Sequence, residues 1–283
     1  MSEQLDIKAL LAIAEQVVRR ASAMALAGQQ RDLQVQTKAN RNDLVTRVDK
    51  DIEEFVAAEL TSRTGYPVLG EEGHGVDSFA GRVWVVDPID GTMNYVETRR
   101  DYAVSLALVS DGQPLIGVVA DVVAGRLYSA VRGHGATCHQ DERDWTRSDA
   151  GGPPTEPGRS TEELAQVPSD KGFRDSIIIT DLKEIRAMPR LVAALVESRG
   201  HRRYGSAALE CLEVASGRAG AFVHLWVSPW DIAAAMVICA EAGVTVTRLD
   251  GTPLDVRHKG SILAGAPRAH AELLARLVSD PTQ

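Results

Sequence analysis

Several acidic residues of the sequence stand at predicted turns or helix starts, where carboxylates can carry chemistry. The densest group runs from Asp87 to Asn94 and reads Asp-Pro-Ile-Asp-Gly-Thr-Met-Asn. Asp87 ends a β-branched strand pattern, and Pro88 favours an extended turn that Asp90 shares. Two carboxylates so close cannot both stay ionised in a tight site unless a cation lies between them. With a cation they form an oxygen-lined site that suits Mg²⁺, so this loop predicts a magnesium site.

The same loop also offers a place for an anion. Gly91 and Thr92 begin what the pattern predicts to be a helix. The first amides of a helix have no intrahelical partner and can point at a bound anion. The loop therefore predicts a cation and an anion held next to each other.

Each acidic group taken alone also fits an ordinary structural role. The Asp87–Asp90 pair fits a capped turn, and the Glu71-Glu72 pair fits a solvated turn after a short strand. Asp231 opens a predicted helix, where the helix dipole favours a negative charge. A single metal site explains these groups in one chain more simply than separate roles do.

The motifs around these acids resemble the signatures of the inositol monophosphatase family. The resemblance rests on Gly70-Glu71-Glu72, on the run from Trp84 to Tyr95, and on Trp230-Asp231-Ile-Ala-Ala. The stretch from Lys38 to Asp49 and the Gly205-Ser206-Ala207-Ala208 loop are similar to two further segments of the family. That family belongs to the lithium-sensitive, magnesium-dependent phosphatases, which include fructose bisphosphatases. The similarity runs from the first helix to the last strand and is poorest over 139–172.

The resemblance implies a ligand set for two to three Mg²⁺ ions. One ion would be held by Glu71, Asp87 and the backbone carbonyl of Ile89, and a second by Asp87, Asp90 and Asp231. A third, weaker ion would rest on Glu71 and water. The chemistry would be general metal-ion catalysis by an activated water, with no covalent intermediate.

The resemblance also implies roles for residues around the metals. Glu71 and Thr92 would be catalytic, with Thr92 oriented by Asp43 so that it positions the attacking water. The phosphate would be bound by Asp90, Gly91 and Thr92. The rest of the substrate would contact Gly205, Ser206, Ala207, His224 and Asp231. We therefore expect a phosphatase for a small monoester, an inositol monophosphate or a related polyol or sugar phosphate.

The chain departs from the family pattern at His224, seven residues before Asp231. Animal-type inositol phosphatases have an acidic residue there that contacts the inositol hydroxyls. His224 could bind hydroxyls or could be satisfied within its own strand, and both interpretations stay open. Lys183, Arg202 and Arg203 could reach a second phosphate, although solvated surface charge explains them as well.

Other activities on the same scaffold therefore also stay open. They are fructose bisphosphatase, NADP(H) phosphatase, histidinol phosphatase and phosphoadenosine-phosphate phosphatase. A non-catalytic binding protein is a further alternative. The retention of every expected acid argues against it, because such acids repel one another without a metal.

The hydrophobic patterns predict an α/β protein with an α+β first half and an α/β second half. Predicted helices cover 5–27, 51–61, 188–198, 206–216, 229–242 and 267–278. Predicted strands cover 82–87, 103–109, 115–123, 126–130, 177–180, 222–226, 244–247 and 261–264, the first few as an antiparallel meander. The family resemblance implies a layered αβαβα sandwich. We expect an N-terminal domain over 1–138 with most metal ligands, a Pro/Gly-rich insertion or lid over 139–172, and a C-terminal domain over 173–283.

Composition limits the partners and the compartment. The chain has 283 residues and a net charge of −8, which repels a nucleic-acid backbone and predicts no nucleic-acid partner. A phosphate substrate then needs bound cations that reverse the local field. The sequence has no apolar run long enough to span a membrane and no signal-peptide pattern. Its three widely spaced cysteines, Cys138, Cys211 and Cys239, predict reduced thiols in the cytoplasm, and the resemblance implies a homodimer.

Overall fold

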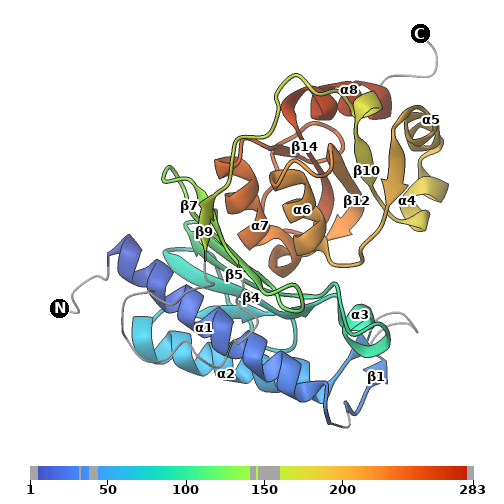
Figure 1. Ribbon diagram of the computed structural model, residues 1–283. Coiled ribbons are helices and arrows are strands. Elements are labelled where there is room, and N and C mark those ends of the chain that lie inside the picture. The colour runs from blue at the N-terminus through green and yellow to red at the C-terminus, as the bar shows by residue number, and fades with distance from the viewer. Residues whose placement is uncertain (1–5, 32, 38–43, 141–144, 146–159, 279–283) are drawn as a thin grey trace.

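Helices and two β-sheets alternate in five layers (Figure 1). The computed structural model describes residues 6–31, 33–37, 44–140, 145 and 160–278. The order of the layers is helices, a seven-stranded sheet, helices, a five-stranded sheet and helices. This is the αβαβα arrangement that the family resemblance implied.

The first layer is a pair of helices, α1 (Ile7–Gly28) and α2 (Arg47–Thr64). Both bury apolar residues at intervals of three and four positions, which places those residues on one helical face. Helix α2 begins four residues earlier than predicted. The side chain of Thr46 caps it, and the Asp49 side chain in turn accepts from the Thr46 amide at 2.9 Å.

The seven-stranded sheet packs one face on these helices. Its strand order is β3-β4-β5-β6-β7-β8-β9, and only β3 and β4 are parallel. The bounds are β3 (Val68–Gly70), β4 (Arg82–Asp90), β5 (Ala103–Ser110), β6 (Gln113–Asp121), β7 (Arg126–Val131), β8 (Ala136–His139) and β9 (Thr161–Glu163). Side chains alternate across a strand, so successive residues of β4 pack into the cores on opposite faces of the sheet. The predicted antiparallel meander is confirmed.

The five-stranded sheet belongs to the second half of the chain and has the order β11-β10-β12-β14-β13. Its strands are β10 (Ile177–Ile179), β11 (Gly200–Arg202), β12 (Ala221–Val227), β13 (Thr245–Thr247) and β14 (Gly260–Gly265). The outer helices are α4 (Leu182–Ala187), α5 (Pro189–Glu197) and α8 (Pro267–Val278). Short elements complete the chain: β1 (Gln36–Thr37), β2 (Leu44–Val45), α3 (Thr92–Glu97) and a 3₁₀ turn, η2 (Phe173–Asp175).

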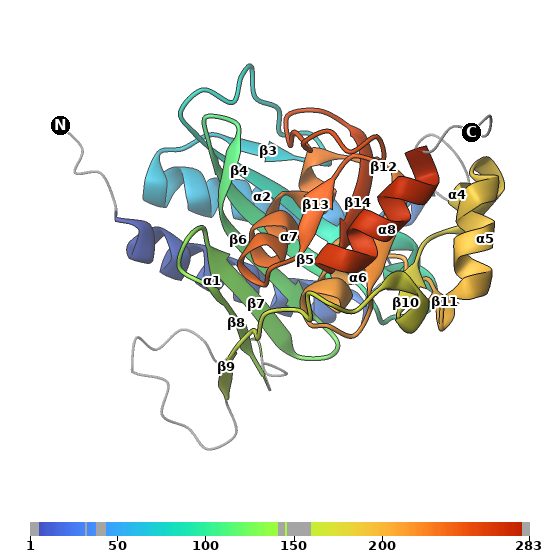
Figure 2. The same ribbon diagram turned by 90° about the horizontal axis from the view of Figure 1, so that it is seen from above.

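Helices α6 (Ala207–Ala215) and α7 (Pro229–Glu241) lie between the two sheets (Figure 1), and Figure 2 shows the same layers from above. Helix α7 is buried over most of its surface, with Ile232, Ala234 and Ile238 fully inside. One continuous core joins residues of both sheets with these two helices. The N-termini of α6 and α7 are thereby held against the first half of the chain.

The interval 139–172 lies largely outside the described residues. Its described ends are ordered parts of the fold, since β9 pairs with β8 and extends the seven-stranded sheet. Trp145 is buried, and its indole N–H donates to the carbonyl of Val122 at 3.0 Å. The domain boundaries proposed from the sequence stay a prediction. Within the described ranges, no helix combines the length and the apolar character that a membrane crossing needs.

The close packing of α7 on β6 can be tested at Gly117. A Cβ added there would lie 2.2 Å from the backbone oxygen of Ala234. We expect Gly117→Ala to lower the free energy of unfolding by about 1–3 kcal/mol, because backbone on both sides prevents relaxation. Urea unfolding would measure it. Gly75→Ala is the control, because there is open space around the added Cβ, and its free energy of unfolding should stay within about 0.5 kcal/mol of the parent value. An unchanged urea midpoint for Gly117→Ala would contradict the close packing of α7 on β6.

Candidate active site

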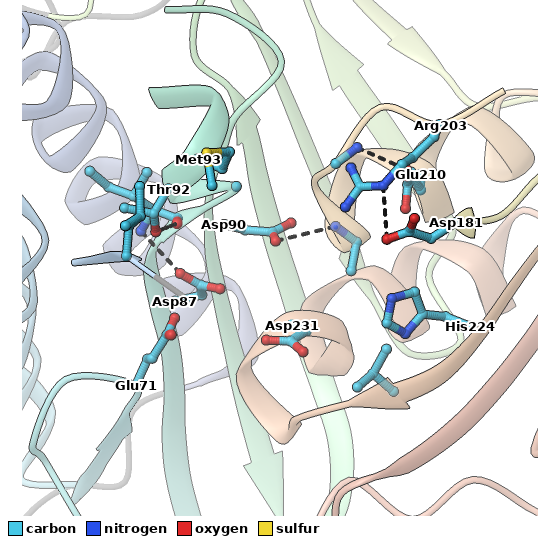
Figure 3. A pocket seen from close by; sticks show the side chains of 16 residues that line it. Glu71, Asp87, Asp90, Thr92, Met93, Asp181, Arg203, Glu210, His224 and Asp231 are labelled. Atoms are coloured by element: carbon cyan, nitrogen blue, oxygen red, sulfur yellow. Dashed lines mark hydrogen bonds and ion pairs between the residues drawn. The ribbon is translucent and has the colours of Figure 1, made fainter. Parts of the chain in front are cut away.

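A pocket lies where the ends of β3 and β4 meet the N-termini of α6 and α7 (Figure 3). Its acidic wall presents Glu71, Asp87, Asp90 and Asp231. Glu71 and both β4 acids come from the first half of the chain, and Asp231 comes from α7 in the second half. The acidic motifs that lie far apart in the sequence therefore meet in one place.

An irregularity at the end of β4 turns Asp87 and Asp90 to the same side. Asp87 pairs with Ser105 and Asp90 pairs with Ala103, so three steps on β4 match two steps on β5. Ser105 and Ala103 face the same side because they are two residues apart, and their partners do so as well. The strand thus runs on to Asp90 rather than ending at Asp87 as predicted. Both carboxylates are almost completely buried.

Asp90 is held by the second half of the chain. Its carboxylate accepts hydrogen bonds from the Ser206 hydroxyl at 2.5 Å, the Ala208 amide at 2.7 Å and the Ala207 amide at 3.2 Å. These donors form the N-terminus of α6, where a negative charge is favoured. Ser206 is fully buried behind the pocket, whereas Gly205 and Ala207 line it.

Gly91 turns the chain from β4 into α3 at a tight approach to the second half. Its φ of 97° is left-handed, and an added Cβ would lie 3.1 Å from the carbonyl oxygen of Gly205. The Asn94 side chain donates to the Tyr204 carbonyl at 2.6 Å, which fastens α3 to the same loop. The predicted helix start at Gly91 and Thr92 is confirmed.

Glu71 lies on a turn that a buried acid supports. Glu53 of α2 accepts from the Glu72 amide at 2.6 Å and from the His74 amide at 3.0 Å. An added Cβ on Gly70 would lie 2.3 Å from the Glu53 carboxyl carbon. Glu53 therefore fixes the turn from which Glu71 reaches the pocket. The sequence analysis missed this role; the only signal was an acid between apolar positions of a helix.

Thr92 contacts Asp49, and the predicted contact with Asp43 stays a prediction. Asp43 lies outside the described residues. The Thr92 hydroxyl is 3.2 Å from Asp49 Oδ1 and 3.2 Å from the Ile89 carbonyl oxygen. Asp49 is buried, and burial raises the pKa of its carboxyl. The available signal was the Thr46-x-x-Asp49 capping pattern, which places Asp49 in the first turn of α2.

Asp231 occupies the first turn of α7 and accepts from the Ser228 amide at 2.7 Å. Burial raises its pKa to about 8, and the neighbouring Asp90 adds to the shift. Burial likewise raises the pKa of Asp90 to about 7. Asp87 has a pKa well above its usual range, because it is buried and faces Glu71, Asp90 and Asp231.

These carboxylates suit a divalent cation. Among the described residues, no lysine or arginine forms an ion pair with Asp87, Asp90 or Asp231. Buried acids that repel one another are stabilised when a cation joins them. As the side chains stand in this structure, no three acidic, histidine or cysteine side chains of the described residues are grouped closely enough to hold an ion. Mg²⁺ prefers carboxylate oxygens and keeps several water ligands, so the chemistry of these donors fits this ion.

The opposite wall of the pocket is polar and carries mixed charge. Arg203 Nε lies 3.0 Å from Asp181 Oδ2. Glu210 accepts from the Tyr204 and Gly205 amides at 2.7 and 2.9 Å. His224, predicted as a substrate contact, also lines this wall. Burial and the nearby Lys183 lower the pKa of His224 to about 4, so its ring is neutral at physiological pH.

Comparison with known proteins agrees with the fold. A profile of the inositol monophosphatase family matches residues 6–283. The chain is 34% identical over 261 residues to an inositol-1-monophosphatase of Bacillus subtilis (strain 168), covering 91% of this chain and 92% of that one. It is 30% identical over 280 residues to the Nus factor SuhB of Pasteurella multocida (strain Pm70), covering 95% of each chain.

Solved structures show the same likeness. Inositol monophosphatase II of Staphylococcus aureus MSSA476 has a TM-score of 0.80 and 33% identity, covering 95% of this chain and 93% of that one. The inositol monophosphate complex of SaIMPase-II has a TM-score of 0.78 and 32% identity over the same shares. An IMPase/NADP phosphatase complexed with Mg²⁺ and phosphate has a TM-score of 0.79 and 25% identity, covering 97% and 96%.

Fold and site together define a hydrolase of phosphoric monoesters. The chain belongs to the inositol monophosphatase family. One relative carries the name of a Nus factor, so the expectation that this chain has no nucleic-acid partner stays a prediction. The cytoplasmic location and the homodimer also stay predictions.

The repulsion among the acids predicts that the stability of the metal-free protein depends on pH. The folded-state pKa of Asp231 is about 8, above the value of 3.8 for a free aspartate. Between these pH values Asp231 holds a proton in the folded state that it has lost in the unfolded state. The free energy of unfolding should therefore fall as pH rises from about 4 to 8. In EDTA, Asp231→Asn should be more stable than the parent by about 1–3 kcal/mol at pH 8 and by less at pH 5.

Chemical unfolding at the two pH values would measure this difference. Asp77→Asn removes an exposed acid outside the pocket and serves as the control. An Asp231→Asn advantage that is equal at pH 5 and pH 8 would contradict the proposed repulsion.

Proposed function

We propose that the protein is a Mg²⁺-dependent phosphatase that hydrolyses the phosphate monoester of a small polyol, an inositol monophosphate or a related sugar phosphate, by direct attack of water. The observation that carries this proposal is the group of buried, mutually repelling carboxylates beside the Thr92–Asp49 contact. A named relative and a solved complex support the substrate class, since one is an inositol-1-monophosphatase and the other holds inositol monophosphate.

Two sets of ligands would hold the metal ions. Glu71, Asp87 and the Ile89 carbonyl would form one set, and Asp87, Asp90 and Asp231 the other, with a third ion on Glu71 and water. Bound Mg²⁺ supplies charge neutralisation at the phosphate, a lower pKa for a bound water and stabilisation of the leaving alkoxide. The Mg²⁺ and phosphate found in a structural relative support this assignment.

The amides of Gly91 and Thr92 would bind the phosphate oxygens. They stand at the start of α3, on the loop that also carries Asp87 and Asp90. The left-handed Gly91 and the Asn94 contact with the second half fix this loop before substrate arrives. Preorganised donors of this kind stabilise the charge of the transition state without reorganising.

Thr92 and Asp49 would orient the attacking water and take its proton. The Thr92 hydroxyl donates to Asp49 and can accept a hydrogen bond from water with a lone pair on its oxygen. Burial raises the pKa of Asp49, which makes this carboxylate a better base. Two contacts from Thr46 keep Asp49 in place.

A second candidate is a substrate that carries another phosphate, such as a sugar bisphosphate or a dinucleotide phosphate. The observation in its favour is Arg203 on the pocket wall. Arg203 is paired with Asp181, however, and this carboxylate would repel a second anionic group. A monophosphate with hydroxyl groups therefore fits the wall better.

Phosphate release would test the metal dependence. Inositol monophosphates, fructose bisphosphate, NADP, histidinol phosphate and phosphoadenosine phosphate would be compared with Mg²⁺, with EDTA and with added Li⁺. We expect Mg²⁺-dependent, Li⁺-sensitive release that EDTA abolishes, with an inositol monophosphate as the best substrate. Asp90→Asn should be inactive. Turnover that persists in EDTA, or in Asp90→Asn, would exclude the proposed mechanism.

Asp49 offers a separate test of the water-orienting pair. Asp49→Asn should lower kcat by about 10²- to 10⁴-fold while Mg²⁺ affinity is retained, because the base is lost and the proposed ligands are not. Asp51→Asn on the same helix is the matched control, since Asp51 is exposed and its one ion pair among the described residues is with Arg47 at the helix surface. Steady-state kinetics and Mg²⁺ titration would measure both variants. Equal kcat values for the two would rule out a catalytic role for Asp49.

A further inference from the structure

The wall opposite the carboxylates carries an ion pair that the hydrolysis itself does not use. Asp181 stands at the junction of β10 and α4, and Arg203 follows β11 (Figure 3). Both side chains line the pocket. They face the acidic wall across the space that the alcohol part of a phosphate ester would fill.

We propose that Asp181 and Arg203 bind two neighbouring hydroxyl groups on the carbon skeleton of the substrate. The pair would thereby select phosphorylated polyols over esters that lack a diol and over bisphosphates. This inference rests on the proposed phosphatase function and names a specificity site within the same pocket.

Arg203 is fixed, yet it remains accessible to a ligand. Its Nε is engaged by Asp181 at 3.0 Å, and this is its one ion pair among the described residues. Its side chain is 46% exposed. An added Cβ on Gly205 would lie 2.4 Å from Arg203 Nη1, so the guanidinium rests against the loop that precedes α6. The terminal N–H groups of Arg203 are thus held near the loop that binds Asp90.

Asp181 is fixed from the other side. Its Oδ1 accepts from the Leu182 amide at 2.5 Å, which caps α4. Partial burial raises its pKa, but the hydrogen bond and charge of Arg203 outweigh that effect and hold the pKa below its usual range. Asp181 is therefore an ionised acceptor at neutral pH. Each of its oxygens keeps a further lone pair for a ligand.

The combination of one donor group and one acceptor group favours hydroxyls over an anion. A hydroxyl both donates and accepts, so two adjacent hydroxyls can satisfy Arg203 and Asp181 together. A second phosphate would gain from Arg203 but would meet the negative charges of Asp181 and Glu210 on the same wall. Among the described residues that line this pocket, Arg203 is the one lysine or arginine, and His224 adds no charge because burial and the nearby Lys183 lower its pKa to about 4. The wall has no net positive charge that would hold a second anion.

The test compares three substrates: inositol 1-phosphate, cyclohexyl phosphate, which has the same ring without hydroxyls, and fructose 1,6-bisphosphate. The variants are Arg203→Gln and Asp181→Asn, the second of which keeps an oxygen to cap α4. Arg202→Gln is the matched control, because Arg202 is the adjacent, exposed arginine and its side chain, among the described residues, bonds only the carbonyl of its neighbour His201.

We expect Arg203→Gln and Asp181→Asn to lower kcat/KM for inositol 1-phosphate by about 10- to 100-fold, as the loss of a hydrogen bond to a charged group implies. The kcat/KM for cyclohexyl phosphate should change less than twofold in both variants. Arg202→Gln should leave kcat/KM unchanged for both substrates. If kcat/KM fell more for fructose 1,6-bisphosphate than for inositol 1-phosphate, the diol site would be overturned in favour of an anion site.

An equal loss for inositol 1-phosphate and cyclohexyl phosphate would also overturn the diol site, since the pair would then support the phosphate end or the fold. Thermal unfolding and Mg²⁺ titration of each variant separate these two causes. Failure of the wild-type protein to hydrolyse any of the three esters with Mg²⁺ would instead refute the proposed phosphatase function.

Discussion

The repulsion among the buried carboxylates of Asp87, Asp90 and Asp231 is the constraint on which the rest of the site depends. Each carboxylate is stabilised by nearby donors: the Ile89 amide for Asp87, the start of α6 for Asp90, and the Ser228 amide for Asp231. These donors lower the cost of ionisation only in part, because the pKa values stay raised. The fold thus prepares a cavity of negative charge that a divalent cation would stabilise.

The five-layer arrangement follows from where these donors must lie. Helices α6 and α7 are packed between the two sheets and share one core with both. Their N-termini therefore meet the end of β4, and each brings backbone amides or an acid to the pocket. Because Asp90 belongs to the first half and its donors to the second, the site forms only when both halves are folded together.

The pocket has two walls that differ in charge and suit different parts of a substrate. The acidic wall suits metal ions and phosphate, whereas the opposite wall, with Asp181, Glu210, Arg203 and His224, carries both signs of charge. Such a wall offers hydrogen bonds with direction and little net attraction for a further anion. Chemistry and selectivity can therefore vary separately within this family scaffold.

The sequence alone determined the acidic loop from Asp87 to Thr92, the helix start behind it and the α/β class, because these depend on local spacing and periodicity; the layered arrangement came from the family resemblance. It also predicted that Glu71 and Asp231 join the metal site, first because one site explains all the acidic groups and then through the family resemblance. Tertiary structure decided that Asp49 contacts Thr92 43 residues away, and that Glu53 supports the Glu71 turn. It likewise decided that Asp181 and Arg203 face the pocket. Such contacts depend on how helices and sheets pack across the core, and no spacing along the chain encodes which side chains then meet.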